Sequence, residues 1–288
     1  MADFLVPDGF AGPRGLRALA REGTVVLEAV RYVRWDRSAR DQHRATPYAL
    51  RADVSREGHG GGQPVLLVPG FLAGDYTLAP MARHLRRRGY RTYRSGIVAN
   101  VGCIDEATAT LERRLEHIVD RRERKVAVVG HSLGGMMARG LAARRPDLVS
   151  GIVTMGSPML APGAAHELLL AQVALLKRLQ SLGLSRVMGR DCTEGACATR
   201  MWEQSRLPLP ADLPFTAVYS PRDGIADWRA CVAPDGEAAE VPTSHVGMAV
   251  DPVVIDHVLA TLARIAAQPA ERLRPGADVR FDRAAEAG

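Results

Sequence analysis

Short apolar runs alternate along the chain with longer stretches in which apolar residues recur every three or four positions. A continuous run such as Pro64-Val65-Leu66-Leu67-Val68 is typical of a strand buried on both faces of a parallel sheet. Strands alternating with helices predict an α/β fold with a mostly parallel central sheet and helices on both faces. We predict strands at 64–68, 90–93, 125–129, 151–155, 215–219 and 239–241, and helices at 14–36, 77–88, 105–122, 136–145 and 252–266. Asp105 is expected to cap the third of these helices.

The alternation is interrupted between the strand ending at Met155 and the strand beginning at Phe215. The centre of this interval, 166–184, carries more leucine and valine than one face of a surface helix needs. We therefore assign 157–212 to a helical cap or lid insertion. Two interpretations stay open: a lid that contacts lipid surfaces transiently through 160–184, or a cap helix that completes the core.

The segments on either side of the predicted sheet differ from it in composition. Residues 1–63 are predicted to form a helical N-terminal extension and linker, and 64–267 the α/β domain. Residues 268–288 are charged and poor in large apolar side chains, which predicts disorder. No stretch has the length and apolarity of a membrane span, and the first 15 residues lack the apolar core of a signal peptide. We expect a cytoplasmic protein.

The basic composition does not indicate a nucleic-acid partner. The 288-residue chain is 47% hydrophobic, enough for a sizeable core, and carries a net charge of +6. Arginine supplies all but two of the 38 basic residues and is scattered, apart from runs such as 86–88 and 121–122. These runs lie at predicted helix ends, where cations complement the helix dipole, and no nucleic-acid-binding motif accompanies them.

The four cysteines show no motif spacing. Cys103, Cys192, Cys197 and Cys231 include no CxxC pair and have no histidine at zinc-site spacing. Cys192 and Cys197 are candidates for a disulfide in an oxidising compartment, whereas reduced thiols are expected in the cytoplasm. Cys103 and Cys231 are interpreted as small buried apolar residues.

The strand at 125–129 runs directly into Gly130-His131-Ser132-Leu133-Gly134, and a helical pattern follows. In the order strand, tight turn and helix, Gly-x-Ser-x-Gly indicates a nucleophile elbow, which lifts the serine hydroxyl clear of the sheet. A Cβ atom at Gly130 or Gly134 would collide where strand and helix pass closely. Ser132 is the predicted nucleophile, and His131 is expected to pack against or orient the turn.

An activated serine needs a base and a carboxylate that orients the base. Asp223 follows the strand 215–219 in a turn, and His245 lies in the loop after the last predicted strand. Asp227 is an alternative candidate for this carboxylate, but Asp223 lies nearer to the end of the strand. An oxyanion also needs two backbone N–H donors. We expect them from Leu133 and from Phe71, with Leu72 as the reserve for the second donor.

These segments resemble the α/β-hydrolase superfamily, and most closely its small bacterial lipases and esterases, such as triacylglycerol lipases. The match is carried by 68–71, 130–135, 219–223 and 244–248, which together span residues 64–266. The resemblance implies hydrolysis of a small-molecule ester or lipid through an acyl-enzyme on Ser132, with no metal or organic cofactor. Pro69 departs from it, because many relatives have histidine before the oxyanion glycine.

Other functions on the same scaffold remain open at this point. An acyltransferase, thioesterase or amidase would use the same triad, and a non-catalytic ligand-binding protein would share the fold. The presence of all three triad members counts against the last of these. Residues 1–63 lack a clear pair of opening strands, so we expect a sheet with fewer N-terminal strands than the family usually has.

Overall fold

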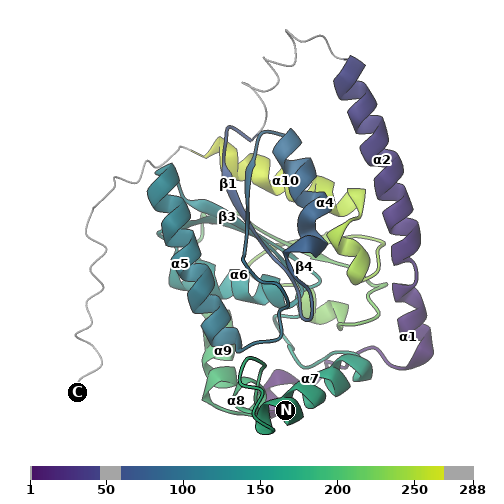
Figure 1. Cartoon of the computed structure of the whole chain (residues 1–288), viewed down its shortest axis with the longest axis vertical. Coiled ribbons are helices and arrows are strands. Elements are labelled where there is room, and N and C mark those ends of the chain that lie inside the picture. The colour runs from purple at the N-terminus through teal and green to yellow at the C-terminus, as the bar shows by residue number, and fades with distance from the viewer. Residues whose placement is uncertain (1, 46–59, 269–288) are drawn as a thin grey trace.

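The computed structural model describes residues 2–45 and 60–268 of the chain (Figure 1). Within these residues, six strands form one sheet in which every neighbouring pair is parallel, in the order β2-β1-β3-β4-β5-β6. The chain therefore first builds outward from β1 to β2 and then continues on the other side of β1. The strands are β1 (Pro64–Val68), β2 (Arg91–Arg94), β3 (Val126–His131), β4 (Val149–Met155), β5 (Phe215–Tyr219) and β6 (Glu237–Glu240).

The central strands are buried on both faces, as their continuous apolar runs predict. Successive side chains point to opposite faces of a strand, so each strand feeds two apolar cores. Val65 and Leu67 face the core under α4 and α10, whereas Leu66 and Val68 face the core under α5 and α6. The fold is thus a parallel sheet with helices on both faces. The helices are α1 (Gly15–Glu22), α2 (Val25–Ala45), α4 (Ala79–Arg87), α5 (Ile104–Arg122), α6 (Leu133–Arg144), α7 (Glu167–Ser181), α8 (Asp191–Glu194), α9 (Ala196–Arg206) and α10 (Pro252–Ala267).

The prediction of one helix over 14–36 is wrong, because the structure has two helices separated at Gly23 and Thr24. Glycine is a poor helix former, and the Thr24 hydroxyl donates to the Arg21 carbonyl, which favours a turn over a continuous helix. The two helices run along one side of the molecule, opposite α5 (Figure 1). The break matters for the site, because it brings Glu22 and Glu28 to neighbouring loops.

Two boundaries of other elements also differ from prediction. Asp105 does not cap α5: Cys103 occupies the cap position, and Asp105 lies in the first turn, where it pairs with Arg200 at 3.1 Å. The last strand runs over Glu237–Glu240 instead of 239–241, because pairing with β5 rather than apolarity sets its limits. The remaining predicted strands match the observed ones closely.

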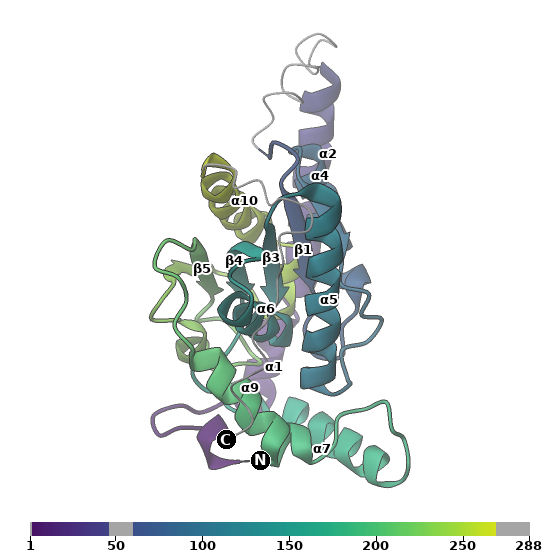
Figure 2. The ribbon, with the colours of Figure 1, turned by 90° about the vertical axis from the view of Figure 1, so that its left-hand side faces the viewer.

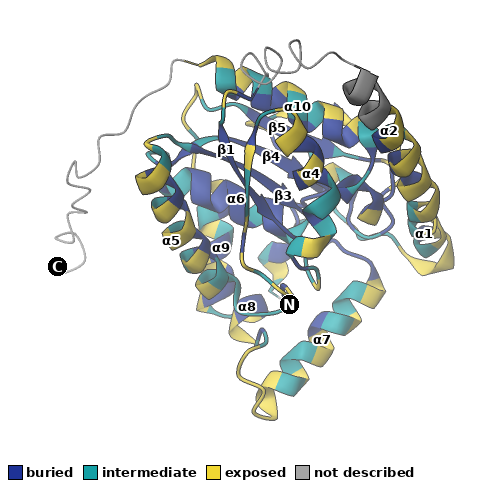
Figure 3. Cartoon of the chain, turned by 45° about the horizontal axis from the view of Figure 1, so that its top comes forward, coloured by how far each residue is buried: buried dark blue, intermediate teal, exposed yellow. Residues whose placement is uncertain are grey.

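The segment between β4 and β5 contains α7, α8 and α9, so the predicted insertion is helical. Figure 2 shows α7 and α9 together at one end of the molecule, with the N-terminal segment beside them. In Figure 3 the central strands β1, β3 and β4 are buried, whereas much of α7 is half-buried or exposed. Leu168 and Leu175 are exposed on α7 and Leu182 is exposed directly after it, while Val173 is buried. Both interpretations of this helix therefore stay open.

The parallel sheet directs the carboxyl ends of all six strands to one edge. The loops after β1, β3, β4, β5 and β6 gather there, and they contain every residue that the sequence assigns to the site. Within 2–45 and 60–268, no helix is long and apolar enough to cross a membrane. All of the predicted disordered tail 268–288 except Gln268 lies outside the described residues, as does most of the predicted linker.

Candidate active site

Ser132 lies in a tight turn between β3 and α6 with φ 52° and ψ −122°, a conformation that non-glycine residues rarely adopt. Its N–H donates to the Met155 carbonyl at 2.8 Å, which fixes the turn to β4. A Cβ on Gly130 would lie 2.3 Å from the Gly134 carbonyl oxygen, and a Cβ on Gly134 would lie 2.3 Å from the Val68 oxygen. The close packing expected at these two glycines is therefore present.

His245 and Asp223 are both buried and face each other, with 2.6 Å between Nδ1 and Oδ2. The other carboxylate oxygen of Asp223 accepts from the N–H groups of Ile225 and Ala226, at 2.8 and 2.7 Å. A carboxylate only accepts hydrogen bonds, so Nδ1 of His245 carries the proton and Nε2 is left as the basic nitrogen. Asp227 does not face His245; it pairs with Arg229 at 2.6 Å.

The two buried histidines of the site have opposite pKa shifts. Burial lowers the pKa of His245, but the charge and hydrogen bond of Asp223, together with the charge of Glu22, outweigh burial and raise it. Burial, together with the charge of the neighbouring His245, lowers the pKa of His131 to about 4. Neutral His131 donates from Nε2 to the His245 carbonyl at 2.9 Å, so it holds the loop of His245 against the elbow.

The turns that carry Ser132 and His245 meet at the carboxyl edge of the sheet. A Cβ on Gly70 would lie 3.0 Å from the Cβ of Ser132, and a Cβ on Gly156 would lie 3.1 Å from Nδ1 of His245. Gly156 directly follows Met155, the residue that binds the Ser132 N–H. Among the described residues, no hydrogen bond joins the Ser132 hydroxyl to the His245 ring. Such bonds are often long before substrate binds.

The loop after β1 offers one of the two predicted oxyanion donors. Within the described part of the chain, the N–H groups of Phe71 and Leu133 donate to no other group. The reserve donor Leu72 is wrong, because its N–H donates to the Asn100 carbonyl at 3.1 Å. The Asn100 side chain is buried and donates to the Pro69 carbonyl at 2.9 Å. Asn100 thus holds this turn in place, and no motif in the sequence indicates it.

The N-terminal helices supply two carboxylates that hold the loops of Asp223 and His245. Glu22, at the end of α1, accepts from the N–H groups of Gly224, His245 and Val246, at 2.8, 3.0 and 2.9 Å. The buried Glu28 of α2 accepts from the N–H and hydroxyl of Ser244, at 2.8 and 2.6 Å. Sequence reasoning missed both glutamates, because a glutamate at a helix end carries no local signal of such a contact.

An apolar cavity opens at Ser132 and is lined largely by residues of α7, α8 and α9 and of the segments next to them. Its wall includes Leu133 and Phe71, the residues whose N–H groups are free, and Leu5 from the N-terminal segment. The remaining lining is mostly aliphatic or aromatic, and includes Met136, Leu169, Leu170, Val173, Met201 and Trp202. A serine hydroxyl beside backbone donors and an apolar chamber suits a substrate with one polar reacting centre and an apolar group.

Comparisons with known proteins agree with this architecture. A family model described as the alpha/beta hydrolase fold matches residues 103–184. A lipase of Bacillus licheniformis, BlEst2 in its mature form, superposes with a TM-score of 0.54 at 14% identity, over 70% of this chain and 92% of that chain. A monoacylglycerol lipase of Paleococcus ferrophilus superposes with a TM-score of 0.51 at 16% identity, over 70% and 94%. No curated protein matches the chain.

At these identities the likeness establishes the fold and not the substrate. The chain has the alpha/beta-hydrolase fold, the class of protein that its sequence motifs resemble. About 30% of the chain lies outside the superposed part.

Proposed function

We propose that the protein is a serine hydrolase that cleaves carboxylic esters with apolar acyl groups through an acyl-enzyme on Ser132. The observation that supports this most directly is the 2.6 Å contact between Asp223 and His245, formed by buried groups at the same sheet edge as the strained Ser132 turn. In this arrangement the Asp223 carboxylate orients the base.

In the proposed reaction, Nε2 of His245 takes the proton of the Ser132 hydroxyl as Oγ attacks the ester carbonyl carbon. The N–H groups of Leu133 and Phe71 bind the oxyanion, and Asp223 stabilises the imidazolium that forms. His245 then protonates the departing alcohol. Water, deprotonated by His245, attacks the acyl carbon, and the acid leaves as Ser132 regains its proton.

The apolar lining of the cavity favours binding of an apolar acyl group over a charged one. Its lining offers many apolar contacts, and burial of each methylene contributes about 0.8 kcal/mol. We expect kcat/KM to rise with acyl length over a graded series of p-nitrophenyl esters. Assays above and below the solubility limit of the longer esters also test α7: a jump in rate at the interface supports a lipid-contacting lid, and a preference for short soluble esters argues against one.

Replacement of Ser132 by alanine tests the proposal. Ser132→Ala should abolish turnover of p-nitrophenyl esters and labelling by a fluorophosphonate probe, with an unchanged circular dichroism spectrum. Ser181→Ala, at an exposed serine of α7, is the matched control and should retain both. Turnover retained by Ser132→Ala would refute the nucleophile. Product analysis with an added alcohol separates hydrolysis from acyl transfer, and failure of the probe to label the wild type would favour a non-catalytic ligand-binding protein.

A further inference from the structure

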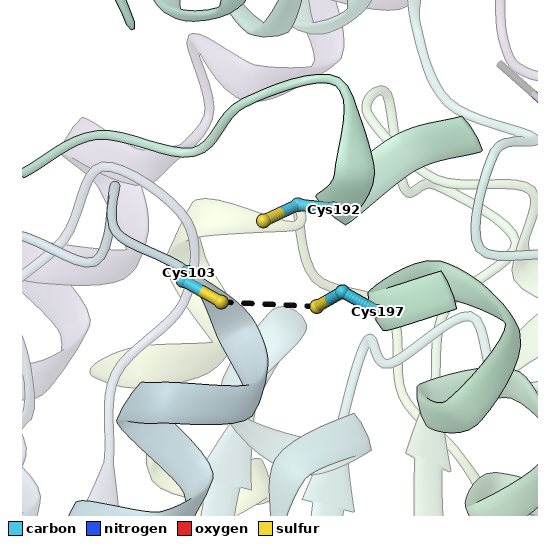
Figure 4. Close-up of side chains that lie close together, drawn as sticks. All are labelled: Cys103, Cys192 and Cys197. Atoms are coloured by element: carbon cyan, nitrogen blue, oxygen red, sulfur yellow. Dashed lines mark hydrogen bonds between the residues drawn. The ribbon is translucent and has the colours of Figure 1, made fainter. Parts of the chain in front are cut away.

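Three cysteines from separate elements lie close together where the helical insertion between β4 and β5 meets the start of α5. Cys103 occupies the cap position of α5, Cys192 lies in α8, and Cys197 lies in the first turn of α9. Their sulfur atoms all lie within 4.8 Å of one another, and those of Cys103 and Cys197 are 3.7 Å apart. Figure 4 shows the sulfur atoms of Cys103 and Cys197 pointing toward each other, with that of Cys192 beside them. All three are free thiols.

We propose that Cys103, Cys192 and Cys197 bind one zinc ion through their thiolates. Zinc binds cysteine sulfur at about 2.3 Å with tetrahedral angles, which places the sulfur atoms of one site about 3.8 Å apart. The Cys103–Cys197 distance of 3.7 Å already fits one edge of that tetrahedron. Small side-chain rotations bring the third sulfur to the same spacing, because all three lie within 4.8 Å.

A disulfide explains the cluster less well. A sulfur–sulfur bond is about 2.05 Å long, so any pair would have to approach from the present separation. Three thiols also form at most one disulfide among themselves, which would leave the third thiol unpaired. A metal ion uses all three sulfur atoms, and thiolates are the ligands that soft and borderline metals such as zinc prefer.

Helix dipoles favour negative charge on sulfur at the cluster, whereas burial opposes it and raises the pKa of the Cys103 thiol, so a zinc ion would have to displace the thiol protons. Cys103 and Cys197 lie at the amino ends of α5 and α9, which have 19 and 11 residues, and peptide dipoles at helix amino ends stabilise thiolates. Val173, Met188 and Phe71 pack around the cluster. A dication in such an apolar setting attracts thiolates strongly.

The zinc site would join the helical insertion to the core of the fold. Cys103 belongs to the segment before α5, which packs against the sheet, whereas Cys192 and Cys197 belong to the insertion. Cys192 also lines the apolar cavity, so the metal would fix the wall of the chamber beside Ser132. Three protein ligands leave the fourth tetrahedral position to a water molecule. This inference stands whether or not the protein hydrolyses esters.

Metal binding to the whole chain tests the proposal. The protein is purified with a phosphine reductant, incubated with Zn²⁺, dialysed and measured by elemental mass spectrometry, and Co²⁺ is used in parallel as a spectroscopic probe. We expect one zinc per chain and, with Co²⁺, a thiolate-to-metal charge-transfer band and visible bands of tetrahedral coordination. Cys103→Ser, Cys192→Ser and Cys197→Ser should each lose stoichiometric zinc and the charge-transfer band.

Cys231→Ala is the matched control, because Cys231 is a buried thiol outside the cluster. It should keep one zinc per chain. Zinc should also raise the thermal midpoint of the wild type and of this control, but not that of the three serine variants. Absence of zinc from reduced wild-type protein, binding of Cu⁺ without Zn²⁺, or zinc retained by all three serine variants would overturn the proposal. So would a stable disulfide between two of these cysteines, found by mass spectrometry after alkylation, that persists in the reductant.

Discussion

Replacement of Glu22 by glutamine removes the charge of this side chain and keeps its shape. Glu22 is a positioning residue: its carboxylate accepts from Gly224 on the Asp223 loop and from His245 and Val246 on the base loop. Glutamine has one acceptor oxygen and an amide that donates, so at least one of these three N–H groups would face another donor. We expect Glu22→Gln to fold and to lose activity.

The size of the loss follows from the bonds. A hydrogen bond to a charged group contributes about 1.5–3 kcal/mol, and loss of one such bond, expressed wholly in the transition state, lowers kcat/KM about ten- to a hundredfold. The charge of Glu22 also raises the pKa of His245. The base must be neutral to accept the Ser132 proton, so activity falls as pH drops through that pKa. Removal of the charge lowers the pKa and moves the acid limb to lower pH.

The assay is the pH profile of kcat/KM for a soluble p-nitrophenyl ester, measured for wild type, Glu22→Gln and Glu203→Gln. Glu203 is an exposed glutamate on α9 and serves as the matched control. We expect a lower plateau and an acid limb shifted to lower pH in Glu22→Gln only. A lower plateau with an unmoved acid limb would show that Glu22 acts on loop structure without influencing the base. An unchanged profile would refute the whole argument.

Two further variants test other parts of the structure. Asn100→Ala leaves the Pro69 carbonyl without its donor and loosens the turn that carries the Phe71 N–H, so kcat should fall about ten- to a hundredfold at unchanged KM; an unchanged kcat would contradict this role. A second variant concerns the buried His84. Both nitrogens of its ring lack a hydrogen-bond partner in the described structure, and the ring stacks on Trp35 at 4.1 Å between centroids. Burial lowers the pKa of His84 to about 4. Unfolding frees the ring to bind a proton near pH 6.5, so stability is present at neutral pH and is lost as pH falls toward 4. His84→Phe should remove about 1–2 kcal/mol of the stability difference between pH 7 and pH 5, measured by urea unfolding; an unaltered difference would count against it.

Short-range patterns in the sequence were enough to predict the strands of the sheet and the turn at Ser132. The run 64–68 and the motif around Ser132 each specify their structure within a few residues, through side-chain burial and turn geometry. Chain order then placed Asp223 and His245 after successive strands, and parallel strands bring such loops to one edge. The alpha/beta-hydrolase fold was therefore predictable from sequence, as was the position of Asp223 and His245 together at one edge of the sheet.

Tertiary packing alone decided which distant groups support that site. Glu22 lies 223 positions from His245, and only the packing of α1 against the His245 loop brings them together. Leu72 was excluded as a donor only because Asn100 accepts its N–H, and the thiols of Cys103 and Cys197 meet across 94 positions. Such contacts have no local signature, because they arise when separate elements pack together and not from the residues next to them in the chain.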